Sequence, residues 1–560
     1  MPGLTYQPDF TVLSKAFNSD QVLLPGTKAY ESAVFIGNLN YRYTSPAVVL
    51  VAKSVQDVKA AISFAKQNGL KLTVKNGGHS YMGYCLNKGG VVLDMSGMVR
   101  CDIDVDKMTI DMEGGLIWKD VYYKHLEDKR NIVIGGQCAF VGVSGFTLGG
   151  GLSPFSRSYG LGCDNLLEMK IITAQGEEVT VSKEDKDEKK RDLFWALCGG
   201  GGGNFGVTVS MTSKMHKLKD REGRVVCGQL VWNLPQQQDA FDAAMQTFNS
   251  NKCPSELTID ALWSHGPFKQ FTGGMTVIYN GKLEDAQEAL KPLLAHEPFN
   301  NTLQEMPWTN WVEKAEGWDV KSEVQHHHAS FIFAEGAITP ELTTTIGHLV
   351  REAADIVGIT DENHRNSPKC HFLWDHIGAQ TEEILAKDTA FYWRNGHYVA
   401  TIKVQWTNKR KNHAVWVFMK KCQEKLHHFA IDQKAAYVNY IDGMAPNWQE
   451  AYYGQNYARL QKIKSDWDPD NFFNNFQSIK PLGRNEETLP INGVTPSPSR
   501  DGIPSQPLVQ KVENWWDEGA EASCYMMSKE GPLADGDVIQ KGAEVREEIM
   551  KRFCSKQYPM

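Results

Sequence analysis

Along the first 218 residues, the spacing of apolar residues alternates between the spacing typical of strands and the spacing typical of helices. Residues 47–52 form a short valine-rich run, and the apolar residues of 55–65 then recur at helical spacing. Ser54 suits the N-cap of that helix. Further strands are predicted at 71–74, 91–94, 108–112, 169–173, 178–181 and 205–211, with helices at 116–127 and 192–197. This interleaving predicts one α+β unit.

The pattern changes after residue 218. Residues 239–248 and 340–354 read as amphipathic helices, and Thr339 suits the N-cap of the second. Residues 389–406 and 436–440 read as strands of one antiparallel sheet, so we expect a second domain whose antiparallel sheet is covered by helices. The predicted division is a first, α+β domain at 1–218 (core about 45–218), a second domain at 219–435, a segment at 436–483 that returns to the first domain, a Pro-rich linker at 484–507 and a helical tail at 508–560.

Composition narrows the classes of protein. The 560 residues carry a formal charge of -8, which disfavours nucleic acid as a partner. No apolar run reaches membrane-spanning length, so no membrane partner is expected. The N-terminus lacks a basic start followed by an apolar stretch, which favours a cytoplasmic location unless a signal was removed. Eleven cysteines without a CxxC pair read mostly as free thiols.

Two glycine-rich segments precede residue 152. The first is Lys75-Asn76-Gly77-Gly78-His79-Ser80-Tyr81, placed just after a strand, where glycines let backbone N–H groups approach a ligand. A surface turn with an incidental histidine is the alternative. The second runs from Gly135 to Gly151 and holds seven glycines together with Cys138. Its spacing does not fit a Rossmann fingerprint and favours a walled pyrophosphate channel, although a lone cysteine is more often a core residue.

Two later segments add to this picture. Gly199–Gly203 leads through Asn204 and Gly206 into an apolar strand, where a flexible loop should already be ending. Asp468–Phe473 follows Tyr452-Tyr453-Gly454 and contains a proline-initiated turn in which Asn471 can bond its own backbone. Taken alone, the last segment is equally well explained as a well-made turn.

In their order along the chain, these four segments resemble the flavoproteins related to berberine bridge enzyme and to fungal carbohydrate oxidases. The resemblance covers roughly residues 25–483. It implies a PCMH-type FAD-binding domain of the vanillyl-alcohol-oxidase kind and a separate substrate domain. It also implies that His79 bonds to the flavin 8α carbon and that Cys138, 59 residues later (138 − 79), bonds to flavin C6.

The resemblance assigns further roles. The implied cofactor-binding residues are His79, Cys138, Asn76, Gly77, Gly78, Ser80, Val141, Gly142, Ser144, Gly145, Gly150, Gly151, Gly202, Asn204, Gly206, Val207, Asn439, Asn471 and Phe473. Val141 stands at the oxygen gate, where a valine resembles the oxygen-reactive members. The implied catalytic base is Tyr440, with Tyr81 lining the same cavity. Gln405 and Lys403 lie two residues apart on the predicted strand, so they share a face and are further candidates to contact the substrate. Tyr440 is otherwise a strand tyrosine with a satisfied hydroxyl, and Lys403 or an acid such as Asp375 is the fallback base.

The sequence therefore predicts an FAD-dependent oxidase that removes hydride from an alcohol, amine or activated C–H of a small molecule and passes electrons to O2. A place in secondary metabolism is expected. Redox-neutral isomerisation or cyclisation, a secreted-type carbohydrate oxidase and a flavin-carrying binding protein remain as alternatives. His326-His327-His328 invites a metal site, but neighbouring strand residues point to opposite faces, so no metal is expected. The oligomeric state and the substrate stay open.

Overall fold

The computed structural model describes residues 8–126, 130–250, 252–266, 270–315, 324–359 and 367–483. The predicted linker at 484–507 and tail at 508–560 lie outside these residues. The chain divides into one large unit, Met1–Pro25 with Ala33–Leu482, and a second, Gly26–Ser32 with Gly483–Met560. Most of helix α1 (Lys28–Ala33) belongs to the second unit. The predicted boundary at residue 218 stays a prediction.

A four-stranded sheet opens the large unit. Its strand order is β1 (Val22–Leu23), β2 (Val48–Val51), β4 (Val91–Asp94) and β3 (Leu72–Lys75), and all but β1 run parallel. Helix α2 (Val55–Gln67) begins where predicted, because Ser54 Oγ accepts the N–H of Asp57 at 3.2 Å. Short 3-10 turns at Phe10–Lys15 and Ser19–Gln21 precede the sheet. Together these elements bury one aliphatic core.

A six-stranded antiparallel sheet follows. Its strands are β5 (Cys101–Asp104), β6 (Thr109–Glu113), β10 (Val207–Lys217), β8 (Leu166–Ile172), β9 (Glu178–Ser182) and, paired to β10, β7 (Asn131–Val133). Its helical segments are α3 (Trp118–Asp120), a π turn (Val121–Leu126), α4 (Val143–Leu148), α5 (Ser156–Tyr159), a 3-10 turn (Gly162–Asn165) and α6 (Glu188–Leu197). The predicted strands and helices of this region are confirmed.

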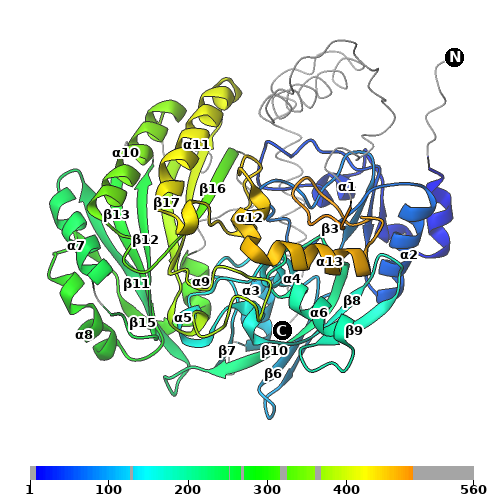
Figure 1. Cartoon of the computed structure of the whole chain (residues 1–560), viewed down its shortest axis with the longest axis horizontal. Coiled ribbons are helices and arrows are strands. Elements are labelled where there is room, and N and C mark those ends of the chain that lie inside the picture. Colours follow the sequence, from blue (N-terminus) through cyan, green and yellow to red (C-terminus); the bar gives the residue numbers. More distant parts are fainter. Residues whose placement is uncertain are drawn as a thin grey trace. The chain divides into compact units, whose positions relative to one another are not determined.

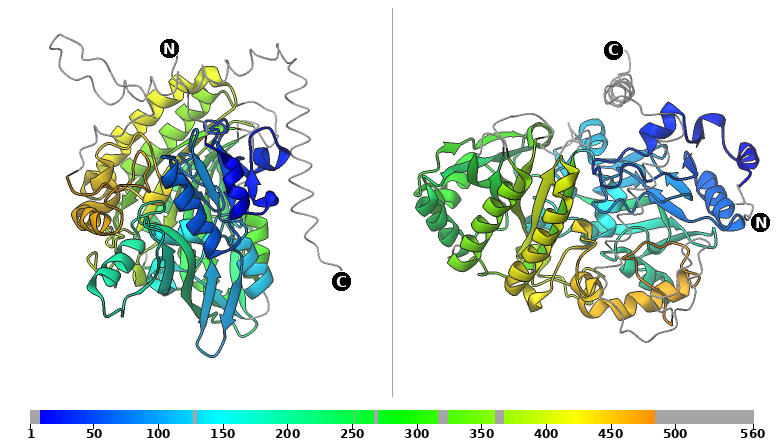
Figure 2. Two further views of the ribbon diagram at one scale, coloured as in Figure 1. Left: turned by 90° about the vertical axis from the view of Figure 1, so that its right-hand side faces the viewer. Right: turned by 90° about the horizontal axis from the view of Figure 1, so that it is seen from above.

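The largest sheet has eight strands. They are β14 (Asn300–Asn301), β11 (Arg224–Leu234), β13 (Phe271–Tyr279), β12 (Leu257–His265), β17 (Lys369–His376), β18 (Tyr398–Trp406), β16 (Gln325–Phe333) and, beside β11, β15 (Gln304–Pro307). Helices α7 (Gln238–Ser250), α8 (Leu283–Leu294), α10 (Pro340–Val357) and α11 (Asn412–Leu426) cover one face (Figure 1, Figure 2), as predicted, and α9 (Trp308–Ala315) joins the core on the other side.

Two predicted strands are wrong in extent or type. Strand β18 begins only at Tyr398, because the preceding backbone turns on itself, with Arg394 N donating to Tyr392 O and Gly396 N to Trp393 O. Residues 436–440 form no strand. The N–H of Ala436 donates to the carbonyl of Ala451 in helix α12 (Trp448–Tyr453) instead, and Val438–Tyr440 is a 3-10 turn.

The chain then returns to the glycine-rich region. Helices α12 (Trp448–Tyr453) and α13 (Tyr457–Trp467) flank a 3-10 turn at Gly454–Asn456, and α13 packs along α6 (Figure 1). Short 3-10 turns at Ala379–Thr381, Lys409–Lys411, His427–Phe429 and Ile431–Gln433 connect the preceding elements. None of the helices in the described ranges has the length and hydropathy of a membrane span.

Candidate active site

The first glycine-rich segment leaves β3 and is tied to the second. Asn76 Nδ2 donates to Gly114 O at 2.6 Å and to Ser144 Oγ at 3.0 Å. Gly77 admits no side chain there, since a Cβ would lie 2.5 Å from Phe140 O. The predicted cofactor residues of the two segments therefore lie against one another, and their glycines are required by close backbone approach.

His79 presents a neutral ring. Its Nε2 is buried and forms no hydrogen bond with the residues that the structure describes. Burial, and after it the charges of Lys403 and Lys75, lower the pKa of His79 to about 4. A neutral imidazole keeps a lone pair on one ring nitrogen, so His79 can act as a nucleophile at neutral pH.

Cys138 lies in the same neighbourhood, and its thiol is partly buried. Its carbonyl accepts the N–H of Val141 at 3.3 Å, which holds the predicted oxygen gate one turn away. Burial raises the pKa of Tyr81, and the charge of Cys138 raises it further. Burial lowers the pKa of Lys403, and the charge of Cys138 counteracts that lowering. Since Lys403 also acts on His79, the two predicted tethers and Lys403 are electrostatic neighbours.

Tyr81 joins this loop to the large sheet through its ring. It stacks on His328 of β16, with ring centroids 3.7 Å apart, and on Tyr440, with centroids 5.9 Å apart. His328 Nε2 in turn lies 3.0 Å from His326 Nδ1. The middle histidine, His327, points the other way and bonds to Asp442 Oδ1 at 2.9 Å. Among the described residues no His, Cys, Asp or Glu group is arranged to hold a metal ion.

The predicted base, Tyr440, has a carboxylate partner. Its hydroxyl donates to Asp375 Oδ2 of β17 at 2.7 Å. The pKa of Asp375 is raised to about 6, because burial raises it more than the hydrogen bond from Tyr440 lowers it. Burial and then the charge of Asp375 raise the pKa of Tyr440 well above its usual value. Around neutral pH the pair therefore consists of a phenol and a carboxylate, which can pass a proton from one to the other.

Gln405 and Lys403 share a face of β18, as predicted. Lys403 stands between His328 and His371 in the sheet register, and Gln405 between His326 and Lys369. Gln405 Nε2 donates to Ser367 O at 3.2 Å, which fixes the side chain at the edge of the site.

Comparison with known proteins identifies the family. The model of the FAD binding domain matches residues 46–182, and the model described as berberine and berberine like matches residues 436–480. The two matches fall on the regions that hold His79, Cys138 and Tyr440. The chain is a berberine bridge enzyme-like FAD-linked oxidoreductase.

Relatives span most of this chain. The uncharacterized FAD-linked oxidoreductase YgaK of Bacillus subtilis is 27% identical, over 78% of this chain and 92% of its own length. The VAO-type flavoprotein oxidase VAO615 of Thermothelomyces thermophilus is 26% identical, over 76% and 75%. The solved BBE-like 1 of Physcomitrella patens is similar with a TM-score of 0.70 and 25% identity, over 85% of this chain and 99% of that one. The FAD-binding and BBE-like fold predicted from the motifs is confirmed.

The residues present fit FAD. Three buried polar atoms in the predicted cofactor segments form no hydrogen bond with the described part of the chain, namely His79 Nε2, Asn76 Oδ1 and Asn471 Oδ1. Gly142 would place a Cβ 2.5 Å from the Asn76 side chain, whereas Gly145 and Gly202 have at most one distant neighbour. Such a mixture of tightly packed and open glycines is typical of backbone that lies along a dinucleotide.

The third glycine segment is ordered by Asn204. Its Nδ2 donates to the carbonyls of Gly200 and Gly201 at 3.0 and 3.2 Å, and its Oδ1 accepts the N–H of Ile479 at 3.0 Å. The loop is therefore held in place and not free, against the flexible-loop alternative. Gly206 has φ +156 and Val207 starts β10 in the aliphatic core.

The YVNY segment contributes a contact that the sequence did not single out. Tyr437 Oη accepts both the N–H of Gly151 and Asn439 Nδ2, each at 3.1 Å, and Asn439 also donates to Phe146 O at 2.9 Å. Gly150 and Gly151 need their positive φ values of 120 and 85 to make this turn. Tyr437 and the predicted Asn439 thus bind the second glycine segment.

The Asp468–Phe473 segment is more than a turn. Asp468 is fully buried and accepts from Lys464 Nζ at 2.7 Å and from the N–H of Phe473 at 2.9 Å. Asn471 adopts φ 54, but its Oδ1 does not make the expected bond to the backbone within the described residues, and Phe473 enters the aliphatic core of the first sheet. Ser80, the last of the predicted cofactor residues, accepts the N–H of Tyr84 at 3.0 Å.

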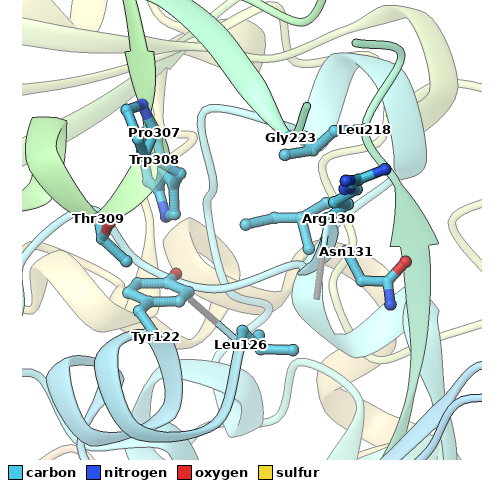
Figure 3. Close-up of a pocket in the computed structure, with 10 residues that line it drawn as sticks. Tyr122, Leu126, Arg130, Asn131, Leu218, Gly223, Pro307, Trp308 and Thr309 are labelled. Carbon is cyan, nitrogen blue, oxygen red and sulfur yellow. The ribbon is translucent and has the colours of Figure 1, made fainter. Parts of the chain in front are cut away.

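A separate small cavity is lined by none of these residues (Figure 3). It is lined by Tyr122, Leu126, Arg130, Asn131, Ile132, Leu218, Gly223, Pro307, Trp308 and Thr309. About 30 Å³ inside it is free, enough for a water molecule and far below what a small-molecule substrate needs. The motifs and the Tyr440–Asp375 pair, rather than this cavity, mark the active site.

Proposed function

We propose that the protein oxidises an alcohol and passes the electrons to O2, forming hydrogen peroxide. The hydrogen bond from Tyr440 to Asp375 carries this proposal, because an alcohol must lose its hydroxyl proton as hydride leaves the adjacent carbon. An amine or an activated C–H substrate would have less use for a phenol backed by a carboxylate.

The proton path uses residues of this chain. Tyr440 takes the hydroxyl proton of the substrate and releases its own proton to Asp375, so no free phenolate has to form. Tyr81, stacked 5.9 Å from Tyr440, fixes the ring of the base. Bound FAD supplies the two-electron acceptor for the hydride. The reaction yields a carbonyl product and a reduced cofactor. O2 is the proposed acceptor of the electrons that the cofactor then holds.

Two further features belong to the proposal. We infer that FAD is attached covalently through His79 and Cys138, supported by the free His79 Nε2 and the neighbouring thiol. We also infer that Val141 leaves room for O2, supported by its place three residues after Cys138. The names of VAO615 and of a tetrahydroberberine oxidase of Argemone mexicana, both relatives of this chain, favour oxidase chemistry over redox-neutral chemistry.

The test is anaerobic mixing with a panel of primary alcohols, sugars, phenolic alcohols and amines while the visible flavin absorbance is followed. An alcohol should bleach the flavin, and admitting air should restore the colour and release one peroxide per carbonyl formed. Product without bleaching would replace this function with isomerisation or cyclisation. Bleaching by amines alone would contradict an alcohol substrate, and bleaching without recovery in air would contradict an oxidase.

A further inference from the structure

A second carboxyl group stands beside Asp375. Strands β12 and β17 pair in antiparallel register from His265–Cys370 to Leu262–Leu373, where the backbone pairing stops. Continuing that register by two residues sets Asp260 opposite Asp375. The N–H of His376 donates to Asp260 Oδ1 at 2.9 Å, which confirms that this carboxyl bridges to β17 next to Asp375.

Both carboxyls lie on the face of the sheet that the helices leave free. Their strand neighbours Ile259, Ala261 and Trp374 point into the core beneath α7 and α10. Side chains alternate along a strand, so Asp260 and Asp375 point to the opposite face, toward Tyr440. Each keeps part of its surface accessible.

No cation lies against the pair in the described part of the chain. Neither carboxyl takes part in any of the salt bridges found there, and Arg157, the nearest buried guanidinium, is engaged elsewhere. It bonds to His376 Nε2 at 2.8 Å and to the carbonyls of Leu257 and Ile377 at 2.8 and 2.7 Å. The other titratable groups that face the pair are the phenols Tyr440, Tyr81 and Tyr437.

We propose that Asp260 and Asp375 divide the acid and base roles of the site, Asp260 holding a proton while Asp375 stays ionised to accept from Tyr440. Two adjacent carboxyls without a counter-cation cannot both ionise cheaply, so one keeps its proton. The proton stays on Asp260. Among the described residues, the Tyr440 hydroxyl donates a hydrogen bond to the carboxylate of Asp375, whereas Asp260 accepts only the backbone N–H of His376. In agreement, burial and then the charge of Asp375 raise the pKa of Asp260 well above its usual value.

Asp260 then acts as a neutral hydrogen-bond donor facing the substrate side. It limits the site to one negative charge, and it can donate its O–H to an oxygen of the substrate next to the reacting carbon. This inference rests on the proposed alcohol oxidation for its catalytic meaning. The protonation state of Asp260 can be measured without turnover.

The first experiment is infrared difference spectroscopy of the holoenzyme at pH 7.5. Subtracting the spectrum of Asp260→Asn from that of the wild type should leave the carbonyl stretch of one protonated carboxylic acid, shifted in D2O. Subtracting the spectrum of Ser264→Ala, a matched change on the same strand, should leave no such band. An acid band unaffected by Asp260→Asn would overturn the proposal, whether or not any substrate is found.

The second experiment is the pH profile of anaerobic flavin reduction. The wild-type rate should rise near pH 6 as Asp375 ionises and fall at alkaline pH as Asp260 ionises. Asp260→Asn keeps an uncharged donor, so it should retain the rise and lose the fall, whereas Ser264→Ala should keep both. An alkaline fall that persists in Asp260→Asn contradicts the role of Asp260. A panel in which no alcohol reduces the flavin contradicts the proposed function and leaves the infrared result to decide Asp260.

Discussion

At the scale of single residues, the buried imidazole of His79 and the thiol of Cys138 make attachment of the flavin directly testable. Acid-precipitated and washed protein should stay yellow if the two proposed covalent bonds hold the cofactor. His79→Ala and Cys138→Ala should each leave one bond and a coloured pellet, and the double variant should release FAD to the supernatant. Cys101→Ala, a half-buried cysteine on β5, serves as the control. A colourless wild-type pellet would exclude both tethers.

The Tyr440 hydroxyl has a second testable consequence. Tyr440→Phe keeps the ring stack on Tyr81 and removes the donor to Asp375. Loss of a general base slows a reaction by about 10²- to 10⁴-fold, so anaerobic flavin reduction should fall by that factor while reoxidation by O2 barely changes. Tyr84→Phe, whose hydroxyl bonds to Gln477 at 3.3 Å, is the matched control. Reduction within about threefold of wild type, well short of a base effect, would make Tyr440 structural.

Val141 tests the other half-reaction. A longer side chain at this position would fill space beside the proposed flavin ring, so Val141→Leu should slow reoxidation far more than reduction. Stopped-flow measurement of the two half-reactions separates them. Val143→Leu, two residues later in the buried start of α4, controls for general crowding. Equal slowing of both half-reactions would remove Val141 from the gate.

At the scale of elements, caps and periodicity predicted the regular pieces well. Thr339 accepts the N–H of Leu342 at the start of α10, and Ser54 does the same for α2. The strand predicted at residues 436–440 is wrong, although their aromatic and β-branched side chains are typical of strands. What decides their shape is remote, since Ala436 donates to Ala451 and Tyr437 to Ser330. Such partners lie outside any local window, so a 3-10 turn there is not visible from the sequence.

Helix α13 supports an element-scale prediction. Asp468 and Lys464 are fully buried together, so Asp468→Ala leaves an unpaired ammonium and two unsatisfied N–H groups. Breaking a buried pair this way costs about 3–5 kcal/mol. Denaturant unfolding followed by tryptophan fluorescence should show that loss, and flavin content should fall because Phe472 and Phe473 are released. Asp466→Ala, exposed on the same helix, should change stability by about 0.5 kcal/mol or less.

At the scale of the whole molecule, the motifs predicted the fold, the cofactor and Tyr440 as a candidate base, but not the hydrogen bond between Tyr440 and Asp375. Tyr440 and Asp375 are 65 residues apart, and only the sheet brings them together. From the sequence, Asp375 was predicted only as an alternative base, and Asp260 was not predicted at all. A lone aspartate among the apolar residues of Leu257–Trp263 was the available signal, because a carboxyl inside a core strand is costly unless it has a role.

The buried histidines of the large sheet make stability depend on pH. His326, His328, His371 and His376 have lowered pKa values through burial, that of His371 reaching about 3. A group whose folded pKa is lowered stabilises the fold above its unfolded pKa of 6.5, and the contribution is lost as pH falls. Asp260 and Asp375 oppose this, since their raised pKa values let the folded state take up protons there.

The unfolded state binds more protons near pH 5, because burial lowers the pKa of His79 and His216 to about 4 as well, so the lowered histidines outnumber the two carboxyls. Stability should therefore fall as the pH drops below 6.5, by about 1.4 kcal/mol per pH unit for each excess proton. Denaturant midpoints between pH 7 and pH 5 measure this slope. His371→Gln removes one of these histidines and should flatten it by about 1.4 kcal/mol per unit, whereas His413→Gln, exposed on α11, should leave it unchanged. A free energy of unfolding that rises toward acid pH would mean that proton uptake by the carboxyls outweighs proton uptake by the histidines.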